Sequence, residues 1–338
     1  MSKPNQAAAV LGGGAFGTAI AVVLGRQGID TRLWVRRQDL ADEINEKREN
    51  EAYLKGVRLP DSVKCMTSVD EVVAGVDAVF FVIPSQFVRA FVVEHRAVWP
   101  LVPLVVCAKG IENGSLQNPY EILRDELPGK YSDMLAVLSG PSFAGEMAQG
   151  QVTNVAVASF NKQVATTVQE ILTDKTFRVY TSSDVLGCEV AGATKNVLAI
   201  AAGAVDGMGL GQNTKAAMVC RGLAEMSRLA KKLGSTGEVM AGLAGIGDLM
   251  LTCNSTLSRN FTVGRRLATG ESLEAVTSGR SVAEGVASAK SLRELAEKAD
   301  VEMPICNMVY QVLYCGKTVP VALSELISRP VADEFRDA

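Results

Sequence analysis

The feature that most constrains the fold is a group of glycines near the start of the chain. Residues 8–11 are apolar and β-prone, glycines follow at positions 12, 14 and 17, and residues 19–24 continue as an apolar helical pattern. Strand, G-x-G-x-x-G and helix in this order are typical of a dinucleotide-binding unit. Gly12 suits the tight turn, Gly14 a close approach to pyrophosphate, and Gly17 close packing of helix on strand. The alternative is a tight turn without a ligand.

The end of the next predicted strand bears on which dinucleotide is bound. Residues 31–35 complete a βαβ unit, and Arg36 and Arg37 follow them. Sites selective for NAD commonly have an acidic residue here, which binds the ribose hydroxyls. A guanidinium can instead bind a 2′-phosphate, so Arg36 favours NADP(H) over NAD(H). The alternative is a solvated pair of charges at a strand end.

Three continuous apolar runs predict further buried strands of a parallel sheet, at residues 77–83, 103–107 and 135–138. Segments 153–159 and 177–181 should extend it. The carboxyl ends of parallel strands share one edge, where ligands of open α/β sheets bind. The glycine loop, Pro84, Lys109 and residues 140–142 should therefore lie along that edge.

From Val185 onward helical periods with glycine-rich breaks replace the strand pattern. The predicted fold class is therefore α/β, with an N-terminal Rossmann-like doubly wound sheet and a C-terminal all-α domain. The predicted domains are 1–186, which binds the dinucleotide, and 187–338, which binds the substrate.

Composition narrows the class of protein. Of 338 residues, 48% are hydrophobic and 21% charged, as in soluble globular proteins, and a net charge of −3 leaves no basic footprint for nucleic acid. Residues 7–24 are uncharged, but four glycines interrupt them, so we expect no membrane span. The seven cysteines form no C-x-x-C pair and His95 is the single histidine, which predicts a reducing, cytoplasmic location and no metal site.

The segment 190–203 is apolar nearly all round a helix, which predicts a buried central helix. An unpaired buried ammonium is strongly unfavourable, so Lys195 needs a partner, a shifted pKa or a ligand. One interpretation is a structural ion pair with Glu189; the other is that Lys195 and Asn196 point into a substrate cleft. The positions of one face are Gly192, Lys195, Asn196, Ala199 and Gly203.

Two further polar groups stand out in apolar, glycine-rich surroundings. Asp248 follows a glycine-rich stretch, where its alternative role is to cap a helix. Residues 252–260 are expected to form a hydroxyl-rich loop that ends in Arg259 and Asn260. A guanidinium with neighbouring hydroxyl and amide donors suits a small phosphate, although a surface arginine is the ordinary explanation.

Together these segments resemble the soluble, bacterial type of NAD(P)-dependent glycerol-3-phosphate dehydrogenase, over about residues 10–317. One departure is mild, since the fingerprint reads Gly-Gly-Gly where a larger residue or alanine is commoner in the middle. The motifs that carry the resemblance are GGGAFGT at 12–18, AKGIE at 108–112, SGPSFA at 139–144, GATKNV at 192–197, AGIGDL at 244–249, SRN at 258–260, VAEG at 282–285 and YQVLYCGK at 310–317.

The resemblance implies the roles of individual residues. Lys195 matches the proton donor and acceptor at the substrate C2 oxygen, Lys109 a second lysine that touches cofactor and substrate, and Asp248 is expected to orient Lys195; these three are the predicted catalytic residues. The predicted substrate contacts are Lys109, Gly140, Ser142, Lys195, Asn196, Asp248, Ser258, Arg259 and Asn260. The predicted cofactor contacts are Gly12, Gly14, Ala15, Phe16, Gly17, Arg36, Lys109, Ala144, Arg259, Val282 and Glu284.

The resemblance also implies the reaction. Enzymes of this type reduce dihydroxyacetone phosphate reversibly to sn-glycerol 3-phosphate with NADPH or NADH, and they need no metal. The product feeds glycerophospholipid synthesis, and a homodimer is expected. Two alternatives stay open at this point. A related β-hydroxyacid-type dehydrogenase would take a carboxylate substrate, and a nucleotide-binding sensor or scaffold would show no turnover.

Overall fold

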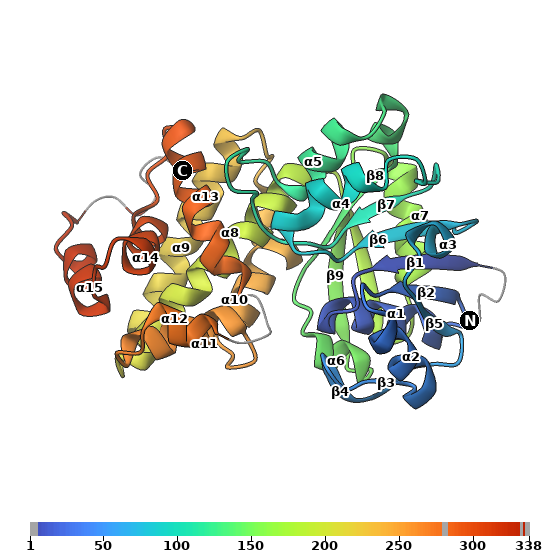
Figure 1. Ribbon diagram of the computed structural model, residues 1–338. Coiled ribbons are helices and arrows are strands. Elements are labelled where there is room, and N and C mark those ends of the chain that lie inside the picture. Colours follow the sequence, from blue (N-terminus) through green and yellow to red (C-terminus); the bar gives the residue numbers. More distant parts are fainter. Residues whose placement is uncertain (1–5, 279–282, 332–333, 335–338) are drawn as a thin grey trace. The chain divides into compact units, whose positions relative to one another are not determined.

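The structure is a computed structural model that describes residues 6–278, 283–331 and 334. The chain divides into two compact units (Figure 1). Unit 1 comprises Met1–Ala108 and Pro119–Val185, and unit 2 comprises Lys109–Asn118 and Leu186–Ala338. The segment Lys109–Asn118 thus lies in unit 2, although the sequence placed it in the first domain. The chain passes from unit 1 to unit 2 after Val185, one residue before the predicted domain boundary at 186/187.

Unit 1 is built on an eight-stranded sheet in the order β10-β9-β8-β7-β6-β1-β2-β5 (Figure 1). All neighbours are parallel except β8 and β9, which are antiparallel. Six neighbouring strands of this sheet, in the order β5-β2-β1-β6-β7-β8, have the strand order of a Rossmann fold. A separate two-stranded ribbon pairs β3 with β4. The strands are β1 (Ala7–Leu11), β2 (Asp30–Trp34), β3 (Glu49–Asn50), β4 (Leu54–Arg58), β5 (Val63–Met66), β6 (Ala78–Phe81), β7 (Leu104–Val106), β8 (Leu135–Ser139), β9 (Thr153–Ala158) and β10 (Phe177–Ser182).

The central strands are almost entirely apolar, as is typical where helices cover both faces of a sheet. Every residue of β6, β7 and β8 is buried, as expected for parallel strands between two helical layers. The crossover from β1 to β2 and the one from β5 back to β6 run in opposite directions, which puts their helices on opposite faces. The helices are α1 (Ala15–Arg26), α2 (Gln38–Lys47), α3 (Val69–Val73), α4 (Val88–Glu94), α5 (Pro119–Glu126), α6 (Ala144–Ala148) and α7 (Lys162–Leu172).

Among its described residues unit 2 contains helices and the segments that connect them, and no strand. Its central helix is α8 (Val185–Gly207), which is long and apolar enough to cross a membrane, but 89% of its most apolar window is buried in the protein, as in the core helix of a soluble protein. The other helices are α9 (Gln212–Lys232), α10 (Asp248–Cys253), α11 (Arg259–Ala268), α12 (Leu273–Thr277), α13 (Glu284–Lys298), α14 (Pro304–Tyr314) and α15 (Val319–Ile327).

Glycines let α8 and α11 cross with their backbones in contact. A Cβ on Gly203 would lie 1.9 Å from the carbonyl oxygen of Phe261, and one on Gly264 would lie 1.8 Å from that of Ile200. Any larger residue at either glycine would push the helices apart. The spacing matters because α8 carries Lys195, and α11 begins with Arg259 and Asn260.

The predicted fold class is confirmed: a Rossmann sheet is followed by helices alone. Segments 153–159 and 177–181 do extend the sheet, with β9 reversed against β8. The prediction was wrong about Arg259 and Asn260, which are the first two residues of α11 and not the end of a loop. The preceding Ser258 caps this helix by accepting a hydrogen bond from the amide of Phe261, so the helix begins one residue after it.

Candidate active site

A buried carboxylate in unit 2 binds two lysines at once. The Nζ of Lys195 lies 2.6 Å from Oδ1 of Asp248, and the Nζ of Lys109 lies 2.7 Å from Oδ2. The Asp248 side chain is 1% exposed, and those of Lys195 and Lys109 are 10% and 14% exposed. The three residues predicted to be catalytic therefore meet around one carboxyl group, although 139 positions separate Lys109 from Asp248.

The local fold at Asp248 explains its burial. One turn of π-helix, Leu243–Gly247, directly precedes α10, and Gly245 within it has a non-helical backbone. A Cβ on Gly245 would lie 2.4 Å from the carbonyl oxygen of Met240, so only glycine lets the turn fold back this tightly. Asp248 is the first residue of α10. The helix N-terminus favours a carboxylate there.

Thr252 is a polar neighbour whose role was missed from the sequence. It lies one turn after Asp248 on α10, and its hydroxyl accepts a hydrogen bond from Nζ of Lys195 at 3.0 Å. The same hydroxyl donates to the carbonyl oxygen of Asp248 at 2.6 Å. Its spacing of four residues from Asp248 would place the two side chains next to each other on a helix, and this could have indicated the role of Thr252.

Burial and charge act in opposite directions on the two central groups. Burial lowers the pKa of Lys195 to about 8, helped by the charge of Lys109 and opposed by Asp248. Burial by itself would raise the pKa of Asp248, but the ammonium groups of Lys109 and Lys195 outweigh it and lower that pKa below its ordinary value. An amine with a pKa near 8 can both give and take a proton close to neutral pH.

A chain of side-chain amides holds the surroundings of the lysines in place. Asn196 donates to the carbonyl oxygen of Lys109 at 3.3 Å, and its own Oδ1 accepts from Asn260 at 2.9 Å. Asn260 in turn accepts from the backbone amide of Gly285 at 3.0 Å. The two asparagines predicted to contact substrate therefore link α8, α11 and α13. Lys195 pairs with Asp248 rather than making the structural pair with Glu189 considered from the sequence.

Other predicted site residues of unit 2 differ in their exposure. Arg259 is exposed at the start of α11, and Ser258 is buried with its oxygen used in the helix cap. Glu284 is half-buried at the first residue of α13. Val282 lies outside the described residues. Among the described residues no group of three or more His, Cys, Asp or Glu side chains is arranged to hold a metal ion.

The glycine loop of unit 1 fits a dinucleotide. Gly12 has φ +128°, and a Cβ on it would lie 2.8 Å from the carbonyl oxygen of Val82; a Cβ on Gly17 would lie 1.8 Å from the carbonyl oxygen of Gly12. Gly14 has open space where its Cβ would be, at the N-cap of α1, so its backbone is bare toward a ligand. Free amides of a helix N-terminus in such a cradle suit a pyrophosphate.

The unusual Gly13 also has a steric reason. A Cβ on it would lie 2.2 Å from Cγ1 of Val35, the residue after β2. Val35 thus fills the space that a larger residue at position 13 would take. Ala15 and Phe16 are the first residues of α1, next to the loop.

Arg36 follows the end of β2 by two residues. The amide of Gly12 donates a hydrogen bond to the carbonyl oxygen of Trp34, the last residue of β2, so the glycine loop and Arg36 lie at the same edge of the sheet. Arg36 is exposed, and within the described residues no hydrogen bond or ion pair occupies its guanidinium. Arg37 is instead paired with Asp39 at 3.3 Å.

The remaining predicted residues of unit 1 follow β8. Gly140 has φ +141° and packs on Val155, where a Cβ would lie 2.9 Å from its Cα. Ser142 donates to the carbonyl oxygen of Gly140 at 2.8 Å, and Ala144 begins α6.

Comparison with known proteins identifies the family. Residues 7–165 match the sequence profile of the N-terminal part of NAD-dependent glycerol-3-phosphate dehydrogenase, and residues 184–324 match that of its C-terminal part. The chain belongs to the NAD-dependent glycerol-3-phosphate dehydrogenase family. The resemblance drawn from the motifs is thereby confirmed.

Individual members of the glycerol-3-phosphate dehydrogenase family match nearly the whole chain. A protein of Anaeromyxobacter dehalogenans named glycerol-3-phosphate dehydrogenase (NAD(P)+) is 46% identical over 97% of this chain and 99% of its own. The glycosomal glycerol-3-phosphate dehydrogenase (NAD(+)) of Trypanosoma brucei rhodesiense is 44% identical over 96% of this chain and 94% of its own. The crystal structure of glycerol-3-phosphate dehydrogenase from Coxiella burnetii superposes with a TM-score of 0.90 at 34% identity, covering 96% of this chain and 99% of that one.

Proposed function

We propose that the protein catalyses the reversible reduction of dihydroxyacetone phosphate to sn-glycerol 3-phosphate with NADPH or NADH. The observation that carries the proposal is the buried Lys195, bonded to Asp248 and Thr252, in a chain of the glycerol-3-phosphate dehydrogenase family. A sensor or scaffold has no use for a buried ammonium with a pKa near 8 beside a second lysine.

Lys195 supplies the acid–base chemistry in this proposal. When bound, the reduced nicotinamide supplies from its C4 the hydride that reduces the carbonyl carbon. The Lys195 ammonium stabilises the negative charge that develops on the former carbonyl oxygen and protonates it. In the reverse direction the neutral amine takes the proton from the hydroxyl group. Asp248 and Thr252 hold the amine in place throughout, and Lys109 adds a second positive charge.

The phosphate of the substrate calls for a cation, and Arg259 is the residue proposed to bind it. Arg259 stands at the N-terminus of α11, where backbone amides also favour an anion. Binding energy from a phosphate away from the reacting carbon orients the carbonyl for reaction. Contacts to substrate from Gly140, Ser142, Asn196, Ser258 and Asn260 remain predictions.

The cofactor is proposed to bind at the glycine loop, with Arg36 favouring NADP(H). The open backbone of Gly14 and the exposed guanidinium of Arg36, which has no ion pair with any described residue, support this assignment. Contacts from Ala15, Phe16, Ala144, Val282 and Glu284 remain predictions.

The decisive experiment is a substrate screen with NADPH and NADH side by side. Oxidation of either cofactor on adding dihydroxyacetone phosphate, with far less on adding unphosphorylated dihydroxyacetone or a 2-keto acid, is the expected result. A preference for the keto acid would favour a β-hydroxyacid-type dehydrogenase. Tight NADPH binding without any substrate-dependent absorbance change would favour the sensor. Lys195→Ala should lose most turnover while its circular dichroism stays that of the wild type.

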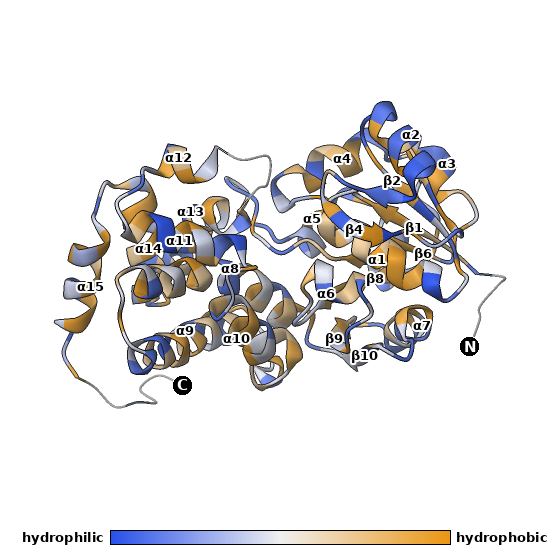
Figure 2. Ribbon diagram, turned by 90° about the horizontal axis from the view of Figure 1, so that it is seen from below, coloured by the Kyte–Doolittle hydropathy of each residue, from blue (hydrophilic) through white to orange (hydrophobic). Residues whose placement is uncertain are grey.

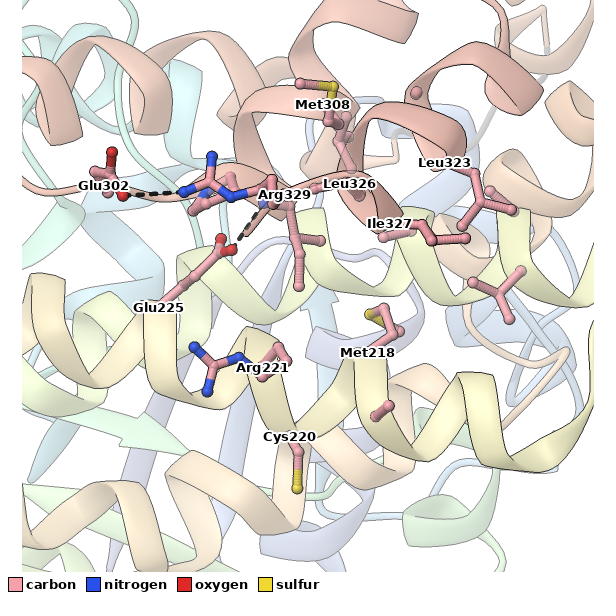
Figure 3. A pocket seen from close by; sticks show the side chains of 18 of the residues that line it. Met218, Cys220, Arg221, Glu225, Glu302, Met308, Leu323, Leu326, Ile327 and Arg329 are labelled. Carbon is pink, nitrogen blue, oxygen red and sulfur yellow. Dashed lines mark hydrogen bonds and ion pairs between the residues drawn. The ribbon is translucent and has the colours of Figure 1, made fainter. Parts of the chain in front are cut away.

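A homodimer is proposed as well, supported by an apolar surface on unit 2. A cavity of about 1500 Å³ lies between α8, α9, α14 and α15, with Met218, Met308 and Leu323 among its apolar lining residues (Figure 3). On α15, Ile327 lines the cavity and is 73% exposed, and Val321 is 49% exposed. Hydrophobic residues make up much of this helix (Figure 2). An exposed apolar surface of this kind typically contacts another protein. Light scattering should give twice the chain mass, and Leu323→Glu should give the monomer.

The protein is proposed to be located in the cytoplasm, and its product is proposed to be used in glycerophospholipid synthesis. All seven cysteines are free thiols, which supports a reducing compartment. The product carries the glycerol backbone and the phosphate of a glycerophospholipid, which supports its use. Depletion of the enzyme should then slow incorporation of labelled glycerol backbone into phospholipid.

A further inference from the structure

The segment Lys109–Asn118 leaves unit 1 and is held by α13 of unit 2. Ser291, in the middle of α13, is fully buried. Its Oγ lies 3.0 Å from the carbonyl oxygen of Ile111 and 2.5 Å from Oδ1 of Asn113. The buried hydroxyl therefore contacts the chain two and four residues after Lys109.

We propose that Ser291 is a positioning residue for the reaction, which acts by fixing the main chain at Ile111 and so keeping Lys109 on Asp248. The inference rests on the proposed function, because it gives Lys109 a part in that reaction. Ser291 itself touches none of Lys195, Asp248 and Thr252 in the described contacts. Its effect on the reaction would pass through the backbone of the segment.

The backbone around Lys109 shows why an anchor is needed. The carbonyl oxygen of Lys109 accepts a hydrogen bond from Asn196, and that of Ile111 accepts one from Ser291. Gly110 lies between these two anchors, and glycine is the residue with the greatest backbone freedom. Losing the second anchor would loosen the main chain on the far side of Gly110. Lys109, with a long flexible side chain, would then hold its position 2.7 Å from Asp248 less firmly.

Ser288 is a control residue that distinguishes a positioning role of Ser291 from a role in packing alone. It lies three residues before Ser291 on α13, is also fully buried, and its hydroxyl has no hydrogen-bond partner among the described residues. The substitutions Ser288→Ala and Ser291→Ala remove the same atom from equally buried sites of one helix. They differ in whether a contact to the Lys109 segment is lost.

The pH dependence gives a readout that a merely structural role would not change. The positive charge of Lys109 is one of the causes that lower the pKa of Lys195, while Asp248 raises it. Displacing Lys109 therefore raises the pKa of Lys195. The rise of glycerol 3-phosphate oxidation with pH should then move to higher pH in Ser291→Ala, and stay in place in Ser288→Ala.

The experiment compares wild type, Ser291→Ala and Ser288→Ala by steady-state kinetics across pH and by hydrogen–deuterium exchange of the ligand-free proteins. For Ser291→Ala we expect kcat to fall roughly tenfold or more, the oxidation limb to move to higher pH, and the amides of Glu112 and Leu116 to exchange faster. Those amides are bonded within the segment, to Gln117 and Glu112. Ser288→Ala should match the wild type in all three measurements.

A folded Ser291→Ala with wild-type kcat, pH profile and exchange would overturn the proposal. If that variant fails to fold, Ser291→Cys keeps the size of the side chain but weakens its donor, and the same expectations apply to it. The exchange measurement needs no turnover. Absence of wild-type activity would therefore reject the proposed function alone, whereas unchanged exchange in an active enzyme would reject the anchor.

Discussion

The amine of Lys195 lies 2.6 Å from a carboxylate oxygen of Asp248, yet its pKa is lowered to about 8. A close carboxylate raises the pKa of an amine, so burial outweighs the ion pair here. Both protonation forms of Lys195 are therefore populated near pH 8, and the two directions of the proposed reaction need opposite forms.

The first prediction follows from the pKa of about 8. Reduction needs the ammonium form of Lys195, so its rate should fall as pH rises through about 8. Oxidation needs the neutral amine, so its rate should rise over the same range. Profiles of kcat/KM against pH in both directions measure this, and an oxidation rate that does not change across this range would remove Lys195 as the titrating group.

The second prediction concerns the carboxylate. Asp248→Asn leaves two lysines with little exposure and no anion between them, which should lower the free energy of unfolding by about 3 kcal/mol. Because Asp248 raises the pKa of Lys195, its loss should move the oxidation limb to lower pH. Urea unfolding and the pH profile of the variant test both parts. An unchanged stability would show that the carboxylate is not holding the lysines.

The third prediction tests cofactor selectivity. Arg36→Asp should raise KM for NADPH far more than KM for NADH, because the new carboxylate repels a 2′-phosphate and can bind ribose hydroxyls. Arg37→Asp is the matched control, since Arg37 is also exposed but already paired with Asp39. Equal losses for both cofactors in Arg36→Asp would contradict the selectivity proposal.

The fourth prediction concerns stability and pH at Glu225, which lines the cavity of unit 2 (Figure 3). Its carboxylate accepts hydrogen bonds from the amides of Ile305 and Cys306 at the start of α14, at 2.7 and 3.2 Å. Burial raises its pKa from the ordinary 4.5 to about 7 despite these bonds. Between the two values the folded protein holds a proton that the unfolded chain has lost. The free energy of unfolding should therefore fall by about 3 kcal/mol as pH rises from 4.5 to 7.

Glu225→Gln cannot titrate and should flatten this dependence. Glu238→Gln, at an exposed position, should keep the wild-type slope. Urea unfolding at several pH values within that window gives the comparison. A Glu225→Gln variant with the wild-type slope would assign the pH dependence to other groups.

Local patterns carried much of the fold. The glycines at 12–17 and the apolar runs of β6, β7 and β8 appear where the sequence put them, because a buried parallel strand needs apolar residues on both faces. The helix of Lys195 was predictable for a similar reason. Apolar residues lie on nearly all sides of this helix, which indicates that it is buried.

Relationships between distant residues were not predictable from residue patterns. Lys195 and Asp248 are 53 positions apart, and nothing local to either residue indicates the distance of 2.6 Å between them. Only the resemblance to a family suggested that Asp248 orients the lysine. Thr252 acquires its role from that pair, and the segment Lys109–Asn118 acquires its place from Ser291 on a helix about 180 residues later.

The assignment of Lys109–Asn118 to unit 2 also bears on how this enzyme can be recombined with its relatives. A chimera that exchanges N-terminal halves by one cut near residue 186 would bring in a foreign Lys109 segment and separate it from its own Ser291. A design that respects the architecture needs three junctions, at 108/109, 118/119 and 185/186. The two units are thus encoded as interleaved pieces, so a substitution within the ten residues Lys109–Asn118 changes contacts inside unit 2 although the flanking chain on both sides belongs to unit 1.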